Sequence, residues 1–116
     1  MAFLNLMASP PRVESALDSV LTISGLGISY GSKHLRFLCP QYCPILDNMV
    51  WERFKYRWDS KGYWLLHQDV MQAADILEQN NVSNPIARPG GKWFAADIDA
   101  AVFAFLQKQA RKNGWV

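Results

Sequence analysis

A pair of glycines, Gly25 and Gly27, constrains the fold of this chain more than any other feature, because it interrupts an otherwise helical pattern. Before the glycines, the segment 12–21 places four apolar side chains on one helical face: Val13, Ala16, Leu17 and Val20. Helical spacing resumes after Gly27 and stops at Pro40, since proline lacks a backbone N–H and disfavours helix in the residue before it. This pattern predicts two helices joined by a tight turn.

The rest of the chain also has helical spacing. Three further segments show it: 47–58, about 63–79 and roughly 96–112. A turn at 59–62 and a loop rich in helix breakers at 84–91 separate these segments. Strand-like alternation is scarce. We therefore predict an all-α fold, a small domain of about five helices that spans residues 1–116.

Composition excludes several classes of protein. Half of the 116 residues are hydrophobic and 19% are charged, which excludes a disordered, collagen-like or highly charged tail protein. No apolar run approaches the roughly 20 residues that cross a bilayer, and the apolar start lacks the basic leading region of a secretory signal. We expect a soluble protein with no membrane partner.

The two cysteines, Cys39 and Cys43, do not form a disulfide framework, although a disulfide across so tight a loop is geometrically possible. A zinc site would need two more ligands, and the only histidines are His34 and His67. We expect two ordinary thiols, no metal site, no cofactor, and the reducing cytoplasm as the compartment.

The glycine turn is the segment that most suggests binding. Exposed backbone amides of Gly25, Gly27 and the first turn of the next helix would form an anion site suited to a phosphate. Ser29, Ser32 and Lys33 would line that phosphate side. A small residue, Gly31, would let the paired helices cross closely. The alternative is a purely structural turn, or one used in protein contacts. The net charge of +2 does not by itself indicate nucleic acid.

This stretch, about 13–38, resembles the helix-hairpin-helix DNA-binding motif. The stretch after it resembles the rest of the helix-hairpin-helix-Gly/Pro-Asp (HhH-GPD) signature of base-excision DNA glycosylases, which include 8-oxoguanine, adenine-mismatch and alkylated-base enzymes. The matching residues are Ile23-Ser24-Gly25-Leu26-Gly27, Gly31, the proline loop 39–44 and Pro44-Ile45-Leu46-Asp47. Asp47 lies 20 positions after Gly27, the interval that this family uses. The resemblance covers about residues 16–58, near a third of the chain.

The resemblance implies chemistry at two positions. The aspartate that matches Asp47 stabilises positive charge on the sugar as the base departs, or orients the attacking nucleophile. Bifunctional members carry a lysine nucleophile two residues after the second hairpin glycine, where this chain has Ser29. Lys33, one helical turn further on, is expected to contact phosphate. The implied activity is hydrolytic removal of a base from double-stranded DNA, without strand cleavage.

The same residues allow other interpretations. Asp47 could serve only as the N-cap of the helix that follows it. Glycosylases of this family are usually longer, with a helical subdomain before the hairpin, so the chain could instead be a non-catalytic DNA- or protein-binding module, or a homodimer that rebuilds the cleft. We expect the aromatic residues to pack mostly in the core or in an oligomer interface: Trp51, Phe54, Tyr56, Trp58, Tyr63 and Trp64.

Overall fold

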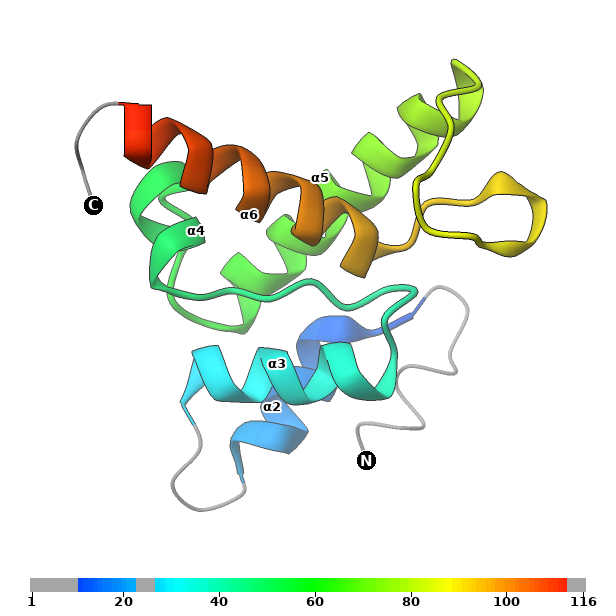
Figure 1. The fold of residues 1–116 in the computed structure, drawn as a ribbon. Coiled ribbons are helices and arrows are strands. Elements are labelled where there is room, and N and C mark those ends of the chain that lie inside the picture. The colour runs from blue at the N-terminus through cyan, green and yellow to red at the C-terminus, as the bar shows by residue number, and fades with distance from the viewer. Residues whose placement is uncertain (1–10, 23–26, 113–116) are drawn as a thin grey trace.

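A computed structural model describes residues 11–22 and 27–112 of the chain (Figure 1). These residues form five α-helices and no strand, which confirms the predicted all-α class. The helices are α2 (Val13–Leu21), α3 (Ile28–Leu38), α4 (Asn48–Phe54), α5 (Ser60–Gln79) and α6 (Ala95–Lys112), with a short 3₁₀ turn, η1 (Pro89–Gly91), before α6. Among the described helices, none is long and apolar enough to span a membrane.

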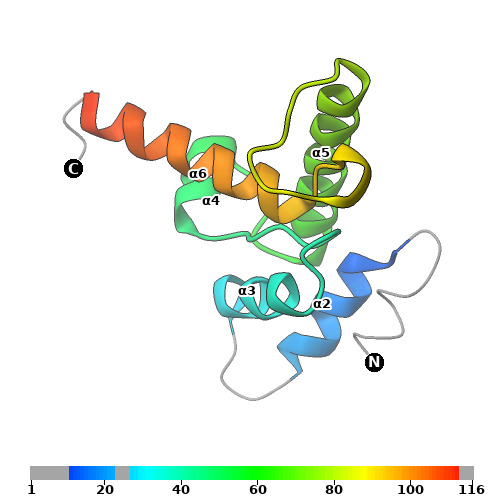
Figure 2. The ribbon, with the colours of Figure 1, turned by 45° about the vertical axis from the view of Figure 1, so that its right-hand side comes forward.

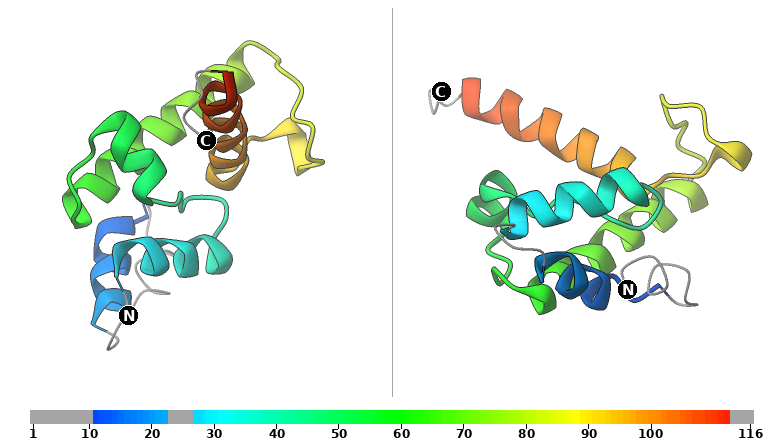
Figure 3. Two further views of the ribbon diagram at one scale, coloured as in Figure 1. Left: turned by 60° about the vertical axis from the view of Figure 1, so that its left-hand side comes forward. Right: turned by 90° about the horizontal axis from the view of Figure 1, so that it is seen from below.

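The helices form two tiers that are joined by the segment 39–47, which contains a turn at 40–42 (Figures 1 and 3). The pair α2 and α3 makes one tier, and α4, α5 and α6 make the other. Helix α2 packs against both α3 and α5, and α5 packs against α6, so α2 and α5 connect the tiers. The core contains fully buried side chains from both tiers, among them Leu17, Leu35, Leu46 and Tyr63.

Helices α2 and α3 cross closely at Gly31. A Cβ atom added at Gly31 would lie 3.1 Å from Leu21 Cδ2 and 3.4 Å from Leu17 Cδ1. This contact agrees with the small residue that the sequence predicts at the crossing. The predicted turn between the two helices, including Gly25 and Leu26, lies outside the described residues.

The boundary between α4 and α5 differs from the prediction. Helix α4 ends at Phe54, because Lys55 adopts a left-handed conformation with φ 59° and ψ 35°. Trp58 is therefore not in the helix, and the predicted segment 47–58 is too long. The predicted turn at 59–62 is the start of α5, where the Asp59 side chain accepts a hydrogen bond from the Gly62 amide (2.8 Å).

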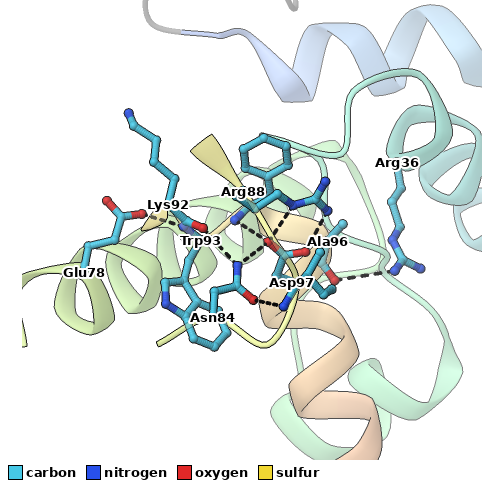
Figure 4. Close-up of polar contacts among 10 residues, drawn as sticks. Arg36, Glu78, Asn84, Arg88, Lys92, Trp93, Ala96 and Asp97 are labelled. Atoms are coloured by element: carbon cyan, nitrogen blue, oxygen red, sulfur yellow. Dashed lines mark hydrogen bonds and ion pairs between the residues drawn. The ribbon is translucent and has the colours of Figure 1, made fainter. Parts of the chain in front are cut away.

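The connection from α5 to α6 folds back over the start of α6 (Figure 2). Asp97, buried in the first turn of α6, accepts hydrogen bonds from the Phe94 amide (2.9 Å) and the Asn84 side chain (2.9 Å). Arg88 pairs with both of its oxygens (Figure 4). Burial alone would raise the pKa of Asp97, but these partners hold it below its ordinary value. The ion pair therefore fixes the loop on α6.

Candidate functional site

The segment 39–47 brings Asp47 to the junction of the tiers, and both tiers hold it. From α3, the Ser32 hydroxyl accepts a hydrogen bond from the Leu46 amide at 3.0 Å. From α5, the Tyr63 hydroxyl donates to the Pro44 carbonyl at 2.9 Å. Because both hydroxyls are fully buried, little solvent competes for these bonds.

Helix α6 holds the other side of the same segment. Its first amides, of Ala95 and Ala96, donate to the carbonyls of Gln41 (3.1 Å) and Pro40 (3.0 Å). One turn further on, Asp99 Oδ2 accepts a hydrogen bond from the Ile45 amide at 2.7 Å. The first amides of α6, which have no partner within the helix, thus donate to carbonyls of segment 39–47. The hydrogen bond to Asp99 holds the end of this segment next to α6.

Asp47 is the N-cap of α4. Its backbone is extended (φ −119°, ψ −179°), and its Oδ1 accepts a hydrogen bond from the Val50 amide at 3.0 Å. The capping role that the sequence allowed for this residue is therefore present. A cap uses one carboxylate oxygen, so it does not exclude a second, chemical role for the same side chain.

Asp47 also lines a cavity of about 350 Å³ between α3, the start of α4 and α6. Three further polar side chains line it: Lys33, Arg36 and Asp99. The remaining wall is apolar: Ile45, Met49, Val50, Ala100, Phe103 and Leu106. The volume is within the usual range of small-molecule sites, and a mostly apolar wall with a few charged groups is typical of them.

Asp99 has the most perturbed carboxyl group of the cavity. Its pKa is raised to about 7: burial and, to a smaller extent, the charge of Asp47 raise it, against the opposing effects of the Ile45 amide and Arg36. Arg36 itself donates to the Ala96 carbonyl at 3.5 Å (Figure 4). The cavity therefore combines a carboxyl group that is partly protonated at neutral pH with a second carboxylate and two cations.

Sequence reasoning did not assign Asp99 to a site, because its place near the start of α6 is equally well explained by the helix dipole. No local motif marks it. Only the contact of α6 with segment 39–47 brings it beside Asp47. Arg36, on α3, also lines the cavity, and no sequence motif marks it.

The residues predicted to bind phosphate are placed differently from one another. Gly27 is exposed and is the extended N-cap of α3, and Ser29 is half-buried in its first turn. Lys33 is exposed, lines the cavity and has its ammonium 5.5 Å from the centre of the Tyr30 ring. Gly25 lies outside the described residues.

Ser32 does not fit the predicted phosphate-binding set. It is fully buried, and its hydroxyl contacts the Leu46 amide and the Ser29 carbonyl (3.1 Å). Its helical position turns the side chain toward segment 39–47 and away from solvent. The prediction that Ser32 lines a phosphate is therefore wrong, and the residue positions the loop that carries Asp47.

The aromatic residues after α3 are mostly at the surface. Of the six that the sequence singled out, Tyr63 is fully buried and Tyr56 half-buried, whereas Trp51, Phe54, Trp58 and Trp64 are exposed. Trp51 and Trp58 pack edge to face, with ring centres 6.3 Å apart. These four side chains are therefore not in the core, and their packing in an oligomer interface stays a prediction. For Trp51 and Phe54 the reason is that α4 is a short helix with no buried residue.

The two cysteines are free thiols. A hydrogen bond from Cys43 lowers the pKa of the half-buried Cys39 to about 6, whereas the same bond and burial raise the pKa of Cys43. Among the described residues, no group of three or more metal-ligating side chains comes together.

Comparison with known proteins gives no match for this chain, whether to a family, a curated protein or a solved structure. The geometry of the cavity and the resemblance to the glycosylase signature are therefore the basis for a functional proposal.

Proposed function

We propose that this chain is a helix-hairpin-helix DNA-binding protein that hydrolyses the N-glycosidic bond of a damaged or mispaired base. One observation carries the proposal: Asp47, the residue that matches the catalytic aspartate of the family, lines a cavity together with cations from α3. A carboxylate in a partly dry cavity interacts strongly with positive charge, because the local dielectric is low.

In this proposal the start of α3 holds the DNA backbone. Gly27, Ser29 and Lys33, with Gly25 of the preceding turn, would bind a phosphate near the cavity mouth. The target base would leave the stack and enter the cavity, as in other enzymes that act on a base within a duplex. Asp47 would then stabilise the developing sugar cation or orient the attacking water. The proposed nucleophile is water, and the proposal involves no metal or other cofactor.

The test combines binding and excision on labelled duplexes that carry 8-oxoguanine, mispaired adenine, uracil or an alkylated base at one position. Alkali treatment reveals abasic sites. The expected result is an alkali-labile product from the wild-type protein that Asp47→Asn does not form, with DNA binding retained. Asp75→Asn, the same change at an exposed position on α5, is the matched control and should keep full activity.

Binding is tested separately at two salt concentrations. Lys33→Gln should weaken binding to all duplexes and reduce the salt dependence, because a phosphate contact releases counterions. Salt-sensitive binding without any product would favour the second candidate, a non-catalytic DNA-binding module. Absence of both binding and product would exclude DNA as the ligand and leave the turn as a structural or protein-binding element.

A second copy of the chain is a further proposed partner. The exposure of Trp51, Trp58 and Trp64 supports it, since large exposed aromatic side chains are enriched at interfaces. A dimeric mass by light scattering would agree with this, and a monomeric mass would exclude it. The proposed compartment is the reducing cytoplasm, because the two cysteines are free thiols.

A further inference from the structure

Two carboxyl groups reach the cavity from different parts of the chain. Asp47 comes from the segment after α3 and is fixed by the Val50 amide. Asp99 comes from the first turns of α6 and is fixed through Oδ2 by the Ile45 amide. Among the described residues, no hydrogen bond reaches Asp99 Oδ1, so one oxygen is anchored and the other remains available. The arrangement gives one site two carboxyl groups with unequal surroundings.

Charged groups from several elements surround Asp99. From α3, Arg36 and Lys33 line the same cavity, and Asp47 faces it from the start of α4. On its other side, Asp99 also lines a smaller apolar cavity of about 160 Å³, shared with Tyr56 and with Asp69 of α5. Burial between the two cavities and the nearby Asp47 charge favour the protonated form of Asp99 and raise its pKa.

Hydrolysis of O-glycosidic bonds usually relies on paired carboxyl groups in unequal surroundings, and an N-glycosidic bond also requires a leaving group to depart from a sugar cation. One group gives a proton to the leaving group, and the other stabilises the sugar cation or activates water. In this cavity the partly protonated group is the half-buried Asp99, and the second group is Asp47. The hydrogen bond from the Ile45 amide would hold the Asp99 carboxyl group in place during the reaction.

We propose that Asp99 is the proton donor to the departing base, and that the base is a neutral purine with a basic ring nitrogen. This inference rests on the proposed glycosylase function. The Asp99 proton moves to a ring nitrogen, the bond between C1′ and N9 breaks, and its electron pair stays with the purine. Water adds to C1′, its proton passes to the Asp47 carboxylate, and both carboxyl groups return to their starting states by exchange with solvent.

The substrate class follows from the need for a proton. A neutral purine becomes a much better leaving group when a ring nitrogen is protonated, so a positioned acid accelerates its departure. A purine that already carries a positive charge, such as 7-methylguanine, needs no such proton. The two kinds of base therefore separate proton donation by Asp99 from a purely structural role.

The experiment measures single-turnover excision by the full chain from pH 5 to pH 9. The duplexes carry mispaired adenine, 8-oxoguanine, uracil or 7-methylguanine, and the proteins are wild type, Asp99→Asn, Asp47→Asn and the control Asp75→Asn. We expect wild-type excision of a neutral purine to fall about tenfold per pH unit above pH 7. Asp99→Asn should lose about 10²- to 10⁴-fold on that purine, and its remaining rate should not follow pH. On 7-methylguanine, the excision rate of Asp99→Asn should stay within a few fold of the wild-type rate.

Ring-nitrogen analogues identify where the proton goes. If adenine is the purine excised, 7-deazaadenine or 3-deazaadenine should resist excision by the wild type, depending on which nitrogen accepts the proton. Resistance of either analogue would support the proposal.

Other outcomes overturn it, and they separate this inference from the function on which it rests. Equal losses of Asp99→Asn on neutral and cationic purines would indicate a structural role. Wild-type excision confined to uracil would exclude the purine proton donor while leaving a glycosylase. Absence of excision by the wild type on every duplex would overturn both the proposed function and the role of Asp99.

Discussion

The hydroxyl of Ser32 accepts a hydrogen bond from the backbone amide of Leu46 at 3.0 Å, and both residues are fully buried. This bond connects the middle of α3 to the residue directly before Asp47. The position of the candidate catalytic carboxylate is therefore set by a side chain that sequence reasoning assigned to DNA.

Ser32→Ala should leave the Leu46 amide buried without its partner. The free energy of unfolding should fall by about 1–3 kcal/mol, the usual cost of a buried unsatisfied group. Urea denaturation measures the change. Ser29→Ala is the matched control, because the Ser29 side chain is half-buried one turn earlier on the same helix. Equal stability of the two variants would contradict the positioning role.

Asp47→Ala and Asp47→Asn should differ in stability. Alanine removes the acceptor of the Val50 amide and should cost about 0.5–2 kcal/mol, whereas asparagine keeps a capping oxygen and should cost only a few tenths. Thermal and urea unfolding measure both values. This difference makes Asp47→Asn the suitable variant for the excision assay. A cost for asparagine as large as that for alanine would show that capping depends on charge.

The glycines of the two tiers should tolerate alanine to different extents. At Gly62 a Cβ atom would lie 1.8 Å from the Arg57 carbonyl oxygen, a backbone atom, so we expect a loss of about 3 kcal/mol or more. At Gly31 the nearest atom is the tip of a flexible leucine, and the helix propensity gained should keep the net change within about 1 kcal/mol.

Gly27→Ala is the control for this series, since no atom lies within 4 Å of its added Cβ and its φ of −90° suits any residue. Its melting temperature should stay near that of the wild type. Gly27→Ala and Gly31→Ala should have similar melting temperatures, and Gly62→Ala should melt at a much lower temperature than either. A melting temperature of Gly62→Ala close to those of the other two variants would mean that the chain between α4 and α5 relaxes around the added Cβ atom.

Asp99 should make the stability depend on pH in a defined direction. Its pKa is about 7 in the folded chain and near 4 when unfolded, so the folded chain binds more protons between those values. The free energy of unfolding contributed by Asp99 therefore falls as pH rises from about 4 to about 7 and is constant above. Relative to the wild type, Asp99→Asn should gain about 2–4 kcal/mol across that interval.

The comparison with Asp99→Asn isolates this effect, because both proteins share the lowered pKa values of His67 and Cys39. Those groups act in the opposite direction, since the unfolded chain binds their protons more readily. Urea denaturation at half-unit pH steps measures the difference. Parallel curves for the two proteins would contradict a raised pKa at Asp99.

Arg88→Met should lower the melting temperature more than Arg57→Met. Arg88 pairs with the almost fully buried Asp97, whereas the Arg57–Asp59 pair is exposed and screened by solvent. The difference in melting temperature between the two variants should become smaller in acid. The pKa of Asp97 is lowered in the folded chain, so the stability that its charge contributes is lost as pH falls through that pKa. Calorimetry at pH 7 and pH 3 measures both effects. Equal losses at pH 7 would mean that the 80–94 loop does not depend on the ion pair.

Much of the local structure was predictable from the sequence, because helical periodicity and breakers act over a few residues. The apolar spacing of 12–21 predicted α2, and the position of Asp47 before an apolar segment predicted its cap. The end of α4 was not predictable, since Lys55 adopts a left-handed conformation that its residue type does not favour. The burial of Ser32 was likewise hidden, because polarity alone suggested a solvent-facing side chain.

The all-α class, the glycine-marked helix pair and the aspartate at a helix start follow from the order of residues, because each depends on neighbours along the chain. The packing of α6 beside segment 39–47, which places Asp99 and Asp47 in one cavity, is a property of the folded chain. These residues are far apart in sequence, and their proximity depends on the core packing of α2, α5 and α6. The proton affinity of Asp99 also depends on that packing, because burial and a neighbouring charge exist only in the folded chain.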